Sequence, residues 1–211
     1  MNSRTLSLIA GVSYLGIFFL AIYANFFVLD SLITDPVGTV SNSEQHVRFG
    51  AIAFLFAAVF DIVVAWVLLE LYRSNQLSRI STYFRLTHAV LMGVGVFALV
   101  SVVNLSTSEE ILAQVATFNT IWLIGLFFFG FHLILLARIV KHIRFIPYVL
   151  ALAGLMYIMD TTAQFAFAAY NSYADVFLML VAIPAVLGEM SFTIWLLVKG
   201  GKITENNIVP K

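Results

Sequence analysis

The sequence predicts an all-α membrane protein: one domain over residues 1–211, folded as a bundle of six transmembrane helices. Its 211 residues are 62% hydrophobic and only 10% charged, and the mean hydropathy is +1.00. Long apolar runs alternate with short polar segments. So few charged side chains could not cover a water-soluble globule of this size, and we therefore expect the lipid bilayer to be the main partner of the surface.

A helix needs about 20 apolar residues to cross a hydrocarbon layer ~30 Å thick. Six stretches qualify, at residues 5–29, 49–72, 82–104, 118–138, 146–170 and 176–198. The first follows a charged start, but it is long and lacks a small-residue cleavage site, so we expect it to be retained and not removed as a signal peptide. The longest connection, Asp30 to Val47, is expected to be an external loop that caps the outer mouth of the bundle.

The basic residues are sorted to one side of the predicted membrane. Ten of the eleven lie on or near that side: Arg4, Arg73, Arg79, Arg85, Arg138, Lys141, Arg144, Lys199, Lys202 and Lys211. Only Arg48 falls among the opposite loops, which carry Asp30, Asp35, Glu44, Glu109, Glu110 and Asp175. The positive-inside rule then places both the N and the C terminus in the cytoplasm, and we expect the membrane to be a bacterial inner membrane.

Several ionisable side chains fall within the predicted spans. They are Asp61, Arg85, His88, His132, Asp160 and Glu189. A charge at the centre of a bilayer costs about 2.5 to 3.5 kcal/mol on insertion scales, so such residues usually face the bundle interior and mark a site or pathway. Small residues flank them at helical spacing, as in Ala185, Glu189 and Thr193, which favours an inward orientation. Any one of them could instead serve helix packing alone.

These residues suggest three kinds of chemistry. The first is binding of a polar ligand or passage of protons by Asp61, His132, Asp160 and Glu189, with Arg85 at the cytoplasmic mouth. The second is a metal site of His88, His132 and Glu189, completed by water, as in zinc hydrolysis. The third is haem ligation by His88 and His132, which are predicted at similar depth.

Other functional classes are excluded or disfavoured. The chain has no cysteine, which removes disulfides, thiolate metal sites and cysteine nucleophiles. No basic patch suggests nucleic acid. Asp61 and Asp160 lack the GxGD context of an intramembrane aspartyl protease, and Ser191 lacks the GxSxG context of a serine nucleophile. No pattern specifies a cofactor or an oligomeric state.

Segments from every part of the chain resemble one bacterial membrane-protein family, known as domain of unknown function 4386. They are SYLGIFFLAIYANF, FDIVVAW, FRLTHAVLMG, WLIGLFFFGFHLILLARIV and PAVLGEMSFTIWLLVKG. The resemblance implies the same membrane class and implies no activity. Asp61, Arg85, His132, Asp160 and Glu189 stand in recognisable segments of the family pattern. His88 stands where the pattern does not require histidine, which weakens both the metal and the haem interpretation.

The sequence therefore favours a small transporter or sensor that binds a polar small molecule or lipid, or moves protons, through Asp61, Arg85, His132, Asp160 and Glu189. The first alternative is an intramembrane metal-assisted hydrolase. The second is a structural subunit of a larger membrane complex.

Overall fold

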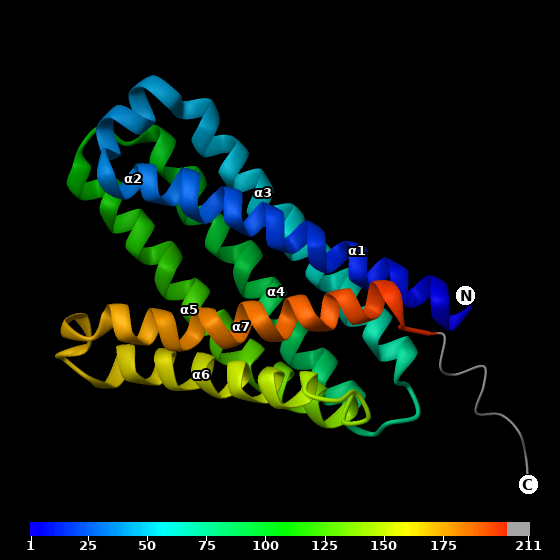
Figure 1. Ribbon diagram of the computed structural model, residues 1–211. Coiled ribbons are helices and arrows are strands. Elements are labelled where there is room, and N and C mark those ends of the chain that lie inside the picture. The colour runs from blue at the N-terminus through cyan, green and yellow to red at the C-terminus, as the bar shows by residue number, and fades with distance from the viewer. Residues whose placement is uncertain (202–211) are drawn as a thin grey trace, which may run out of the picture.

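The computed structural model describes residues 1–201, and within them six helices are long and apolar enough to cross a membrane (Figure 1). The predicted fold class is confirmed, and the chain is a multi-pass membrane protein. The first span runs through α1 (Ser3–Ile22), the π-helical η1 (Tyr23–Leu29) and α2 (Asp30–Thr34). The other five are α3 (Pro36–Leu71), α4 (Leu77–Ser101), α5 (Ser108–Ile139), α6 (Ile146–Ala166) and α7 (Ala174–Val198), with short 3-10 turns η2 (Val102–Asn104) and η3 (Tyr170–Ser172) after α4 and α6.

The expected loop over residues 30–47 is wrong, because this segment is almost entirely helical. Asp35 caps α3 by accepting a hydrogen bond from the Gly38 backbone at 3.0 Å, and Pro36 occupies the first turn. Both are helix-start signals. The backbone bends at Ser43 (φ −140°, ψ 33°) before α3 enters its apolar part. The first span therefore continues through η1 and α2, and α2 joins α3 through a tight turn at Asp35.

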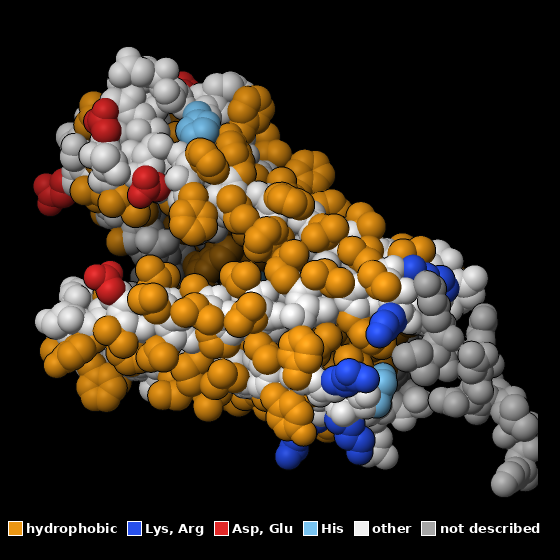
Figure 2. Space-filling model, viewed as in Figure 1, with side chains coloured by type: hydrophobic (Ala, Val, Ile, Leu, Met, Phe, Trp, Pro, Cys, Tyr) orange, Lys and Arg blue, Asp and Glu red, His pale blue; other side chains and the backbone are white. Residues whose placement is uncertain are grey.

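The six long helices form a ring in which α1 packs on α3, α3 on α4, α4 on α5, α5 on α6, α6 on α7, and α7 returns to α1. Their alternating directions create two ends, which we name by charge. At the basic end lie the start of α1, the end of α3 and the end of α7, with Lys and Arg side chains gathered there (Figure 2). Asp and Glu dominate the opposite, acidic end (Figure 2). Lys202 and Lys211, assigned to the basic side from sequence, lie outside the described residues.

Small residues allow the closest helix contacts. A methyl group built at Gly130 on α5 would lie 2.6 Å from the carbonyl oxygen of Gly154 on α6, so both positions require glycine. A methyl group at Gly11 on α1 would lie 2.6 Å from the Leu197 side chain on α7. Such backbone approach is how membrane helices maximise packing without a hydrophobic driving force between them.

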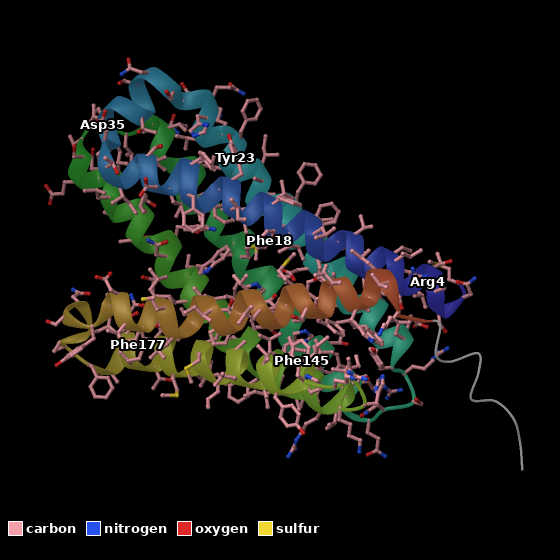
Figure 3. The ribbon with its side chains drawn as sticks, viewed as in Figure 1. Arg4, Phe18, Tyr23, Asp35, Phe145 and Phe177 are labelled. Atoms are coloured by element: carbon pink, nitrogen blue, oxygen red, sulfur yellow. The ribbon has the colours of Figure 1, made fainter. Side chains whose placement is uncertain are left out.

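Helices α1 and α7 meet near the basic end and diverge toward the acidic end (Figure 1). Arg4 fixes the meeting point, because its guanidinium donates to the carbonyl oxygens of Leu196 (3.1 Å), Leu197 (2.5 Å) and Gly200 (3.0 Å); its position beside the end of α7 is visible in Figure 3. The carbonyls of Leu196 and Leu197 belong to the last turn of α7, which a helix end leaves without partners, and Gly200 follows that turn. The divergence leaves a hollow between α1 and α7 that is rimmed by hydrophobic side chains (Figure 2).

Candidate functional site

A buried arginine organises the interior of the bundle. Arg85 on α4 is only 1% exposed and is the largest fully buried side chain among residues 1–201. Its guanidinium forms an ion pair with Asp61 on α3, donates to the Tyr14 hydroxyl on α1 at 2.7 Å, and donates to His132 Nε2 on α5 at 3.1 Å. One side chain thus joins four helices. Arg85 lies inside the bundle, where its charge finds partners, and its expected position at the cytoplasmic mouth stays a prediction.

The second ring nitrogen of His132 faces α4. His132 Nδ1 lies 3.0 Å from the Ser81 carbonyl oxygen and 2.9 Å from Ser81 Oγ. A carbonyl oxygen only accepts hydrogen bonds, and Nε2 accepts one from Arg85, so the pattern assigns the neutral tautomer with its proton on Nδ1. His132 therefore connects α4 to α5 and orients the guanidinium.

Both carboxylate oxygens of Asp61 have partners. Oδ1 accepts from Arg85 and Oδ2 lies 3.5 Å from His88 Nε2. Asp61 is 2% exposed and His88 is 4% exposed. A buried carboxylate needs such pairing to offset the loss of hydration. The charge of Asp61 is thus balanced by that of Arg85.

Aromatic rings complete the surroundings of Arg85. The guanidinium carbon lies 4.6 Å from the centre of the Tyr14 ring and 5.2 Å from that of Phe129, within cation–π range. The Phe129 ring also lies 4.8 Å from His88 and 5.5 Å from His132. The network of Asp61, Arg85, His88, His132 and Tyr14, which we call the Arg85 network, is therefore enclosed as well as hydrogen-bonded.

A cavity of about 190 Å³ adjoins this network. All six long helices line it, with polar groups at one part of the wall and apolar groups over the rest. The lining includes Tyr14, Ile17, Phe18, Ala21, Ala57, Asp61, Arg85, His88, Met92, Trp122, Leu126, Phe129, Tyr157, Ala185, Val186, Glu189, Met190 and Thr193. Phe18 lies on α1 between that helix and α7 (Figure 3).

Glu189 on α7 lines the cavity but lies outside the Arg85 network. Within residues 1–201, no Lys, Arg or His lies within ion-pair distance of its carboxylate; the ion pairs found there involve Glu44, Glu70 and Asp61. Tyr157 on α6 lines the same cavity. Glu189 is thus the one acid of the cavity wall that no cation of the described chain balances.

Asp160, the remaining predicted site residue, is not brought to the cavity. It accepts a hydrogen bond of 2.6 Å from the Tyr170 hydroxyl near the acidic end. Burial, together with this hydrogen bond and the adjacent carboxylate charge, raises the pKa of Tyr170, so the phenol stays a donor at neutral pH. The Tyr170 ring also packs 5.2 Å from Phe177. Asp160 therefore holds the turn between α6 and α7.

The alternative metal set is not assembled. Among residues 1–201, no three His, Asp or Glu side chains are grouped so that they could hold one metal ion. His88, His132 and Glu189 therefore do not form the ligand triad considered from sequence. His132 has both ring nitrogens engaged by Ser81 and Arg85, which also leaves it no free nitrogen for haem iron.

The set of site residues predicted from the sequence did not include several uncharged side chains that line the cavity or contact the Arg85 network, namely Tyr14, Ser81, Trp122, Phe129 and Tyr157. A signal existed on two helices. Ser81, Arg85 and His88 share one face of α4 through the i, i+4, i+7 spacing, and Trp122, Phe129 and His132 share one face of α5 through the i, i+7, i+10 spacing. Tyr14 and Tyr157 could be assigned only after the ring order of the helices was known.

These observations define the class: a multi-pass helical membrane protein with a buried ion-pair network beside an amphipathic cavity. A family model described as domain of unknown function (DUF4386) matches residues 9–200, and the chain belongs to that family. An uncharacterized protein of Archaeoglobus fulgidus is 24% identical over 163 residues, which cover 74% of this chain and 87% of the relative. No solved structure matches the chain.

Proposed function

We propose that this protein is a small transporter or sensor whose cavity binds a polar or amphipathic small molecule, or takes up a proton, at Glu189. One observation carries the proposal. Every other charged group of the cavity wall is balanced within the protein, whereas Glu189 faces the cavity without a cation. An ionisable residue inside a membrane is costly, and an unbalanced one usually marks a ligand or ion site.

In this proposal the residues have different roles. Asp61, Arg85 and His132 hold the wall of the site in place, and Glu189 is the group that contacts the ligand or proton. Asp160 has no part in the site and supports the α6–α7 turn. The orientation belongs to the same proposal: both termini are cytoplasmic, as the gathering of Lys and Arg at the basic end supports, and the membrane is a bacterial inner membrane.

The shape of the bundle supports a binding role over that of a structural subunit. The cavity is enclosed by helices that are firmly joined at the basic end, and it lies beside the hollow between α1 and α7 (Figure 2). Small-molecule sites in helical membrane proteins have this form, with apolar walls and a few convergent polar groups. A purely structural subunit would not need an unbalanced carboxylate there.

The proposal can be tested with protein reconstituted in liposomes that contain a pH-sensitive dye. Proton movement after an imposed pH step and thermal stabilisation by a panel of small polar compounds would be measured for the wild type, for Glu189→Gln and for the control Asp160→Asn. We expect Glu189→Gln to reduce at least one response and Asp160→Asn to leave both unchanged. Equal responses from all three proteins would contradict the proposal.

A further inference from the structure

The Arg, Asp and Glu side chains of the cavity wall, namely Asp61, Arg85 and Glu189, carry a net negative charge when Glu189 is ionised. Asp61 and Arg85 cancel, and His132 is held as a neutral tautomer by its two hydrogen bonds. The carboxylate of Glu189 remains. An anionic ligand in the cavity would meet two carboxylates, and the guanidinium that could attract it is already paired with Asp61. A cationic ligand would meet one carboxylate that forms no ion pair within residues 1–201.

The aromatic side chains that line the cavity also favour a cationic ligand. Arg85 already occupies the faces of Tyr14 and Phe129. Phe18, Trp122 and Tyr157 also line the cavity, and no cation lies over these three rings within residues 1–201. Aromatic faces attract cations electrostatically, and groups of them next to a carboxylate are typical of sites for organic ammonium ions.

The rest of the wall restricts the size and polarity of the ligand. Met92 and Leu126 cover one part, and the edges on α1 and α7 carry Ile17, Val186 and Met190. An apolar cavity of about 150 Å³ can bind benzene, so a cavity of about 190 Å³ accommodates one ring with a small substituent. The hydrophobic rim of the hollow between α1 and α7 suits entry of a lipophilic molecule along the membrane (Figure 2).

We propose that the ligand of this cavity is a monovalent lipophilic organic cation, with its ammonium group at Glu189 and its apolar body against Phe18 and Trp122. The inference rests on the proposed function and adds the charge and the polarity of the ligand. Inorganic cations are disfavoured because the aromatic and aliphatic wall offers few oxygen ligands to replace a hydration shell.

Three water-soluble monosubstituted benzenes of similar size provide the test: phenyltrimethylammonium, neutral benzamide and anionic benzenesulfonate. Binding would be measured by equilibrium dialysis against protein in nanodiscs of zwitterionic lipid, with empty nanodiscs subtracted. We expect the cation to bind at least about tenfold tighter than either of the others, because only it gains both the carboxylate and the aromatic faces.

Variants of Glu189 and Asp160 test whether the cation binds in the cavity. Glu189→Gln keeps the shape of the side chain and should weaken binding of the cation at least about tenfold. Glu189→Asp should restore part of the loss, since it restores the charge. Asp160→Asn is the matched control, and its affinity should stay within about twofold of the wild type because Asp160 lies outside the cavity.

The outcomes separate this inference from the proposed function. Equal or tighter binding of benzamide or benzenesulfonate in a Glu189-dependent way would overturn the choice of a cation and would still support a binding site. Binding of the cation that is the same in wild type and Glu189→Gln would overturn the inference. Absence of binding by all three compounds, together with no Glu189-dependent proton movement, would overturn both. The three-compound comparison on the wild type decides the question even if a variant does not fold.

Discussion

Asp61 and Glu189 line the same cavity from different helices, yet their surroundings differ. The Asp61 carboxylate is 2% exposed, is paired with Arg85 and lies 3.5 Å from His88. Glu189 has no cationic partner within residues 1–201. The comparison teaches that two acids of one cavity wall can serve opposite purposes: one is a structural charge balanced at folding, and the other is left for something outside the polypeptide. Stability measurements should distinguish them.

The largest effect is expected from Asp61→Asn. This change keeps the size of the side chain but leaves the buried guanidinium of Arg85 without a counter-charge. Breaking a buried ion pair by removing one partner costs about 3–5 kcal/mol, so the free energy of unfolding should fall by that amount. Denaturant unfolding in detergent, followed by circular dichroism, measures it. A loss below about 1 kcal/mol, the usual value of an exposed pair, would show that Asp61 and Arg85 are not paired in the bilayer.

Replacing both Asp61 and Arg85 tests the ion pair more directly. The double change Asp61→Leu with Arg85→Met removes both charges and fills the space with apolar groups. Such replacements are often neutral or stabilising in buried ion pairs, so the double variant should be more stable than Asp61→Asn, although Tyr14 and His132 each lose a hydrogen bond worth about 1 kcal/mol. Additive losses in the complete double-mutant cycle would contradict direct pairing.

Asp160, the third acid predicted within the spans, should have an intermediate effect on stability. Tyr170→Phe removes the hydrogen bond to Asp160 near the acidic end, and we expect a loss of about 0.5–1.5 kcal/mol in unfolding free energy. Ligand binding should not change, since neither residue lines the cavity. Hydrogen exchange of the turn after α6 would detect the local loosening, and unchanged exchange there would argue against this hydrogen bond.

The smallest effect on stability is expected from Glu189→Gln. Because no protein cation depends on this carboxylate, the free energy of unfolding should change by less than about 0.5 kcal/mol, or rise as a buried charge is removed. The same unfolding measurement as for Asp61→Asn allows a direct comparison. A loss as large as that of Asp61→Asn would mean that Glu189 has a structural partner and that the contrast between the two acids does not hold.

The six membrane spans could be predicted because the hydropathy of a stretch depends on its composition alone. The ends of the helices could not be predicted in this way. Residues 30–47 looked like a loop because they are polar, but the capping pair Asp35 and Pro36 starts a helix there, and helices of a membrane protein can continue beyond the bilayer. Hydropathy reports how long an apolar stretch is, and capping residues report where the helix begins.

The candidate site was partly predictable for a physical reason. Arg85 and Asp61 were expected to pair because unpaired charges are costly in hydrocarbon, and neutral His132 accepts a hydrogen bond from the same guanidinium. Asp160 lies away from the cavity, which the sequence could not indicate because depth along a helix does not give the lateral direction, and a turn at the end of α6 brings Tyr170 to it. The difference between Asp61 and Glu189 depends on which helix lies opposite, and that follows from the ring order of the bundle.

The hydrogen bonds from Arg4 to the end of α7 have a consequence for biosynthesis. Helix α1 enters the membrane long before residues 196–200 are translated, so the Arg4 guanidinium can form these hydrogen bonds only after α7 has been made. The ring of helices therefore closes only at that stage. A ribosome that stops before Leu196 would release a chain in which α1 and α7 are not joined, and such a product should be a preferred substrate for membrane quality-control proteases.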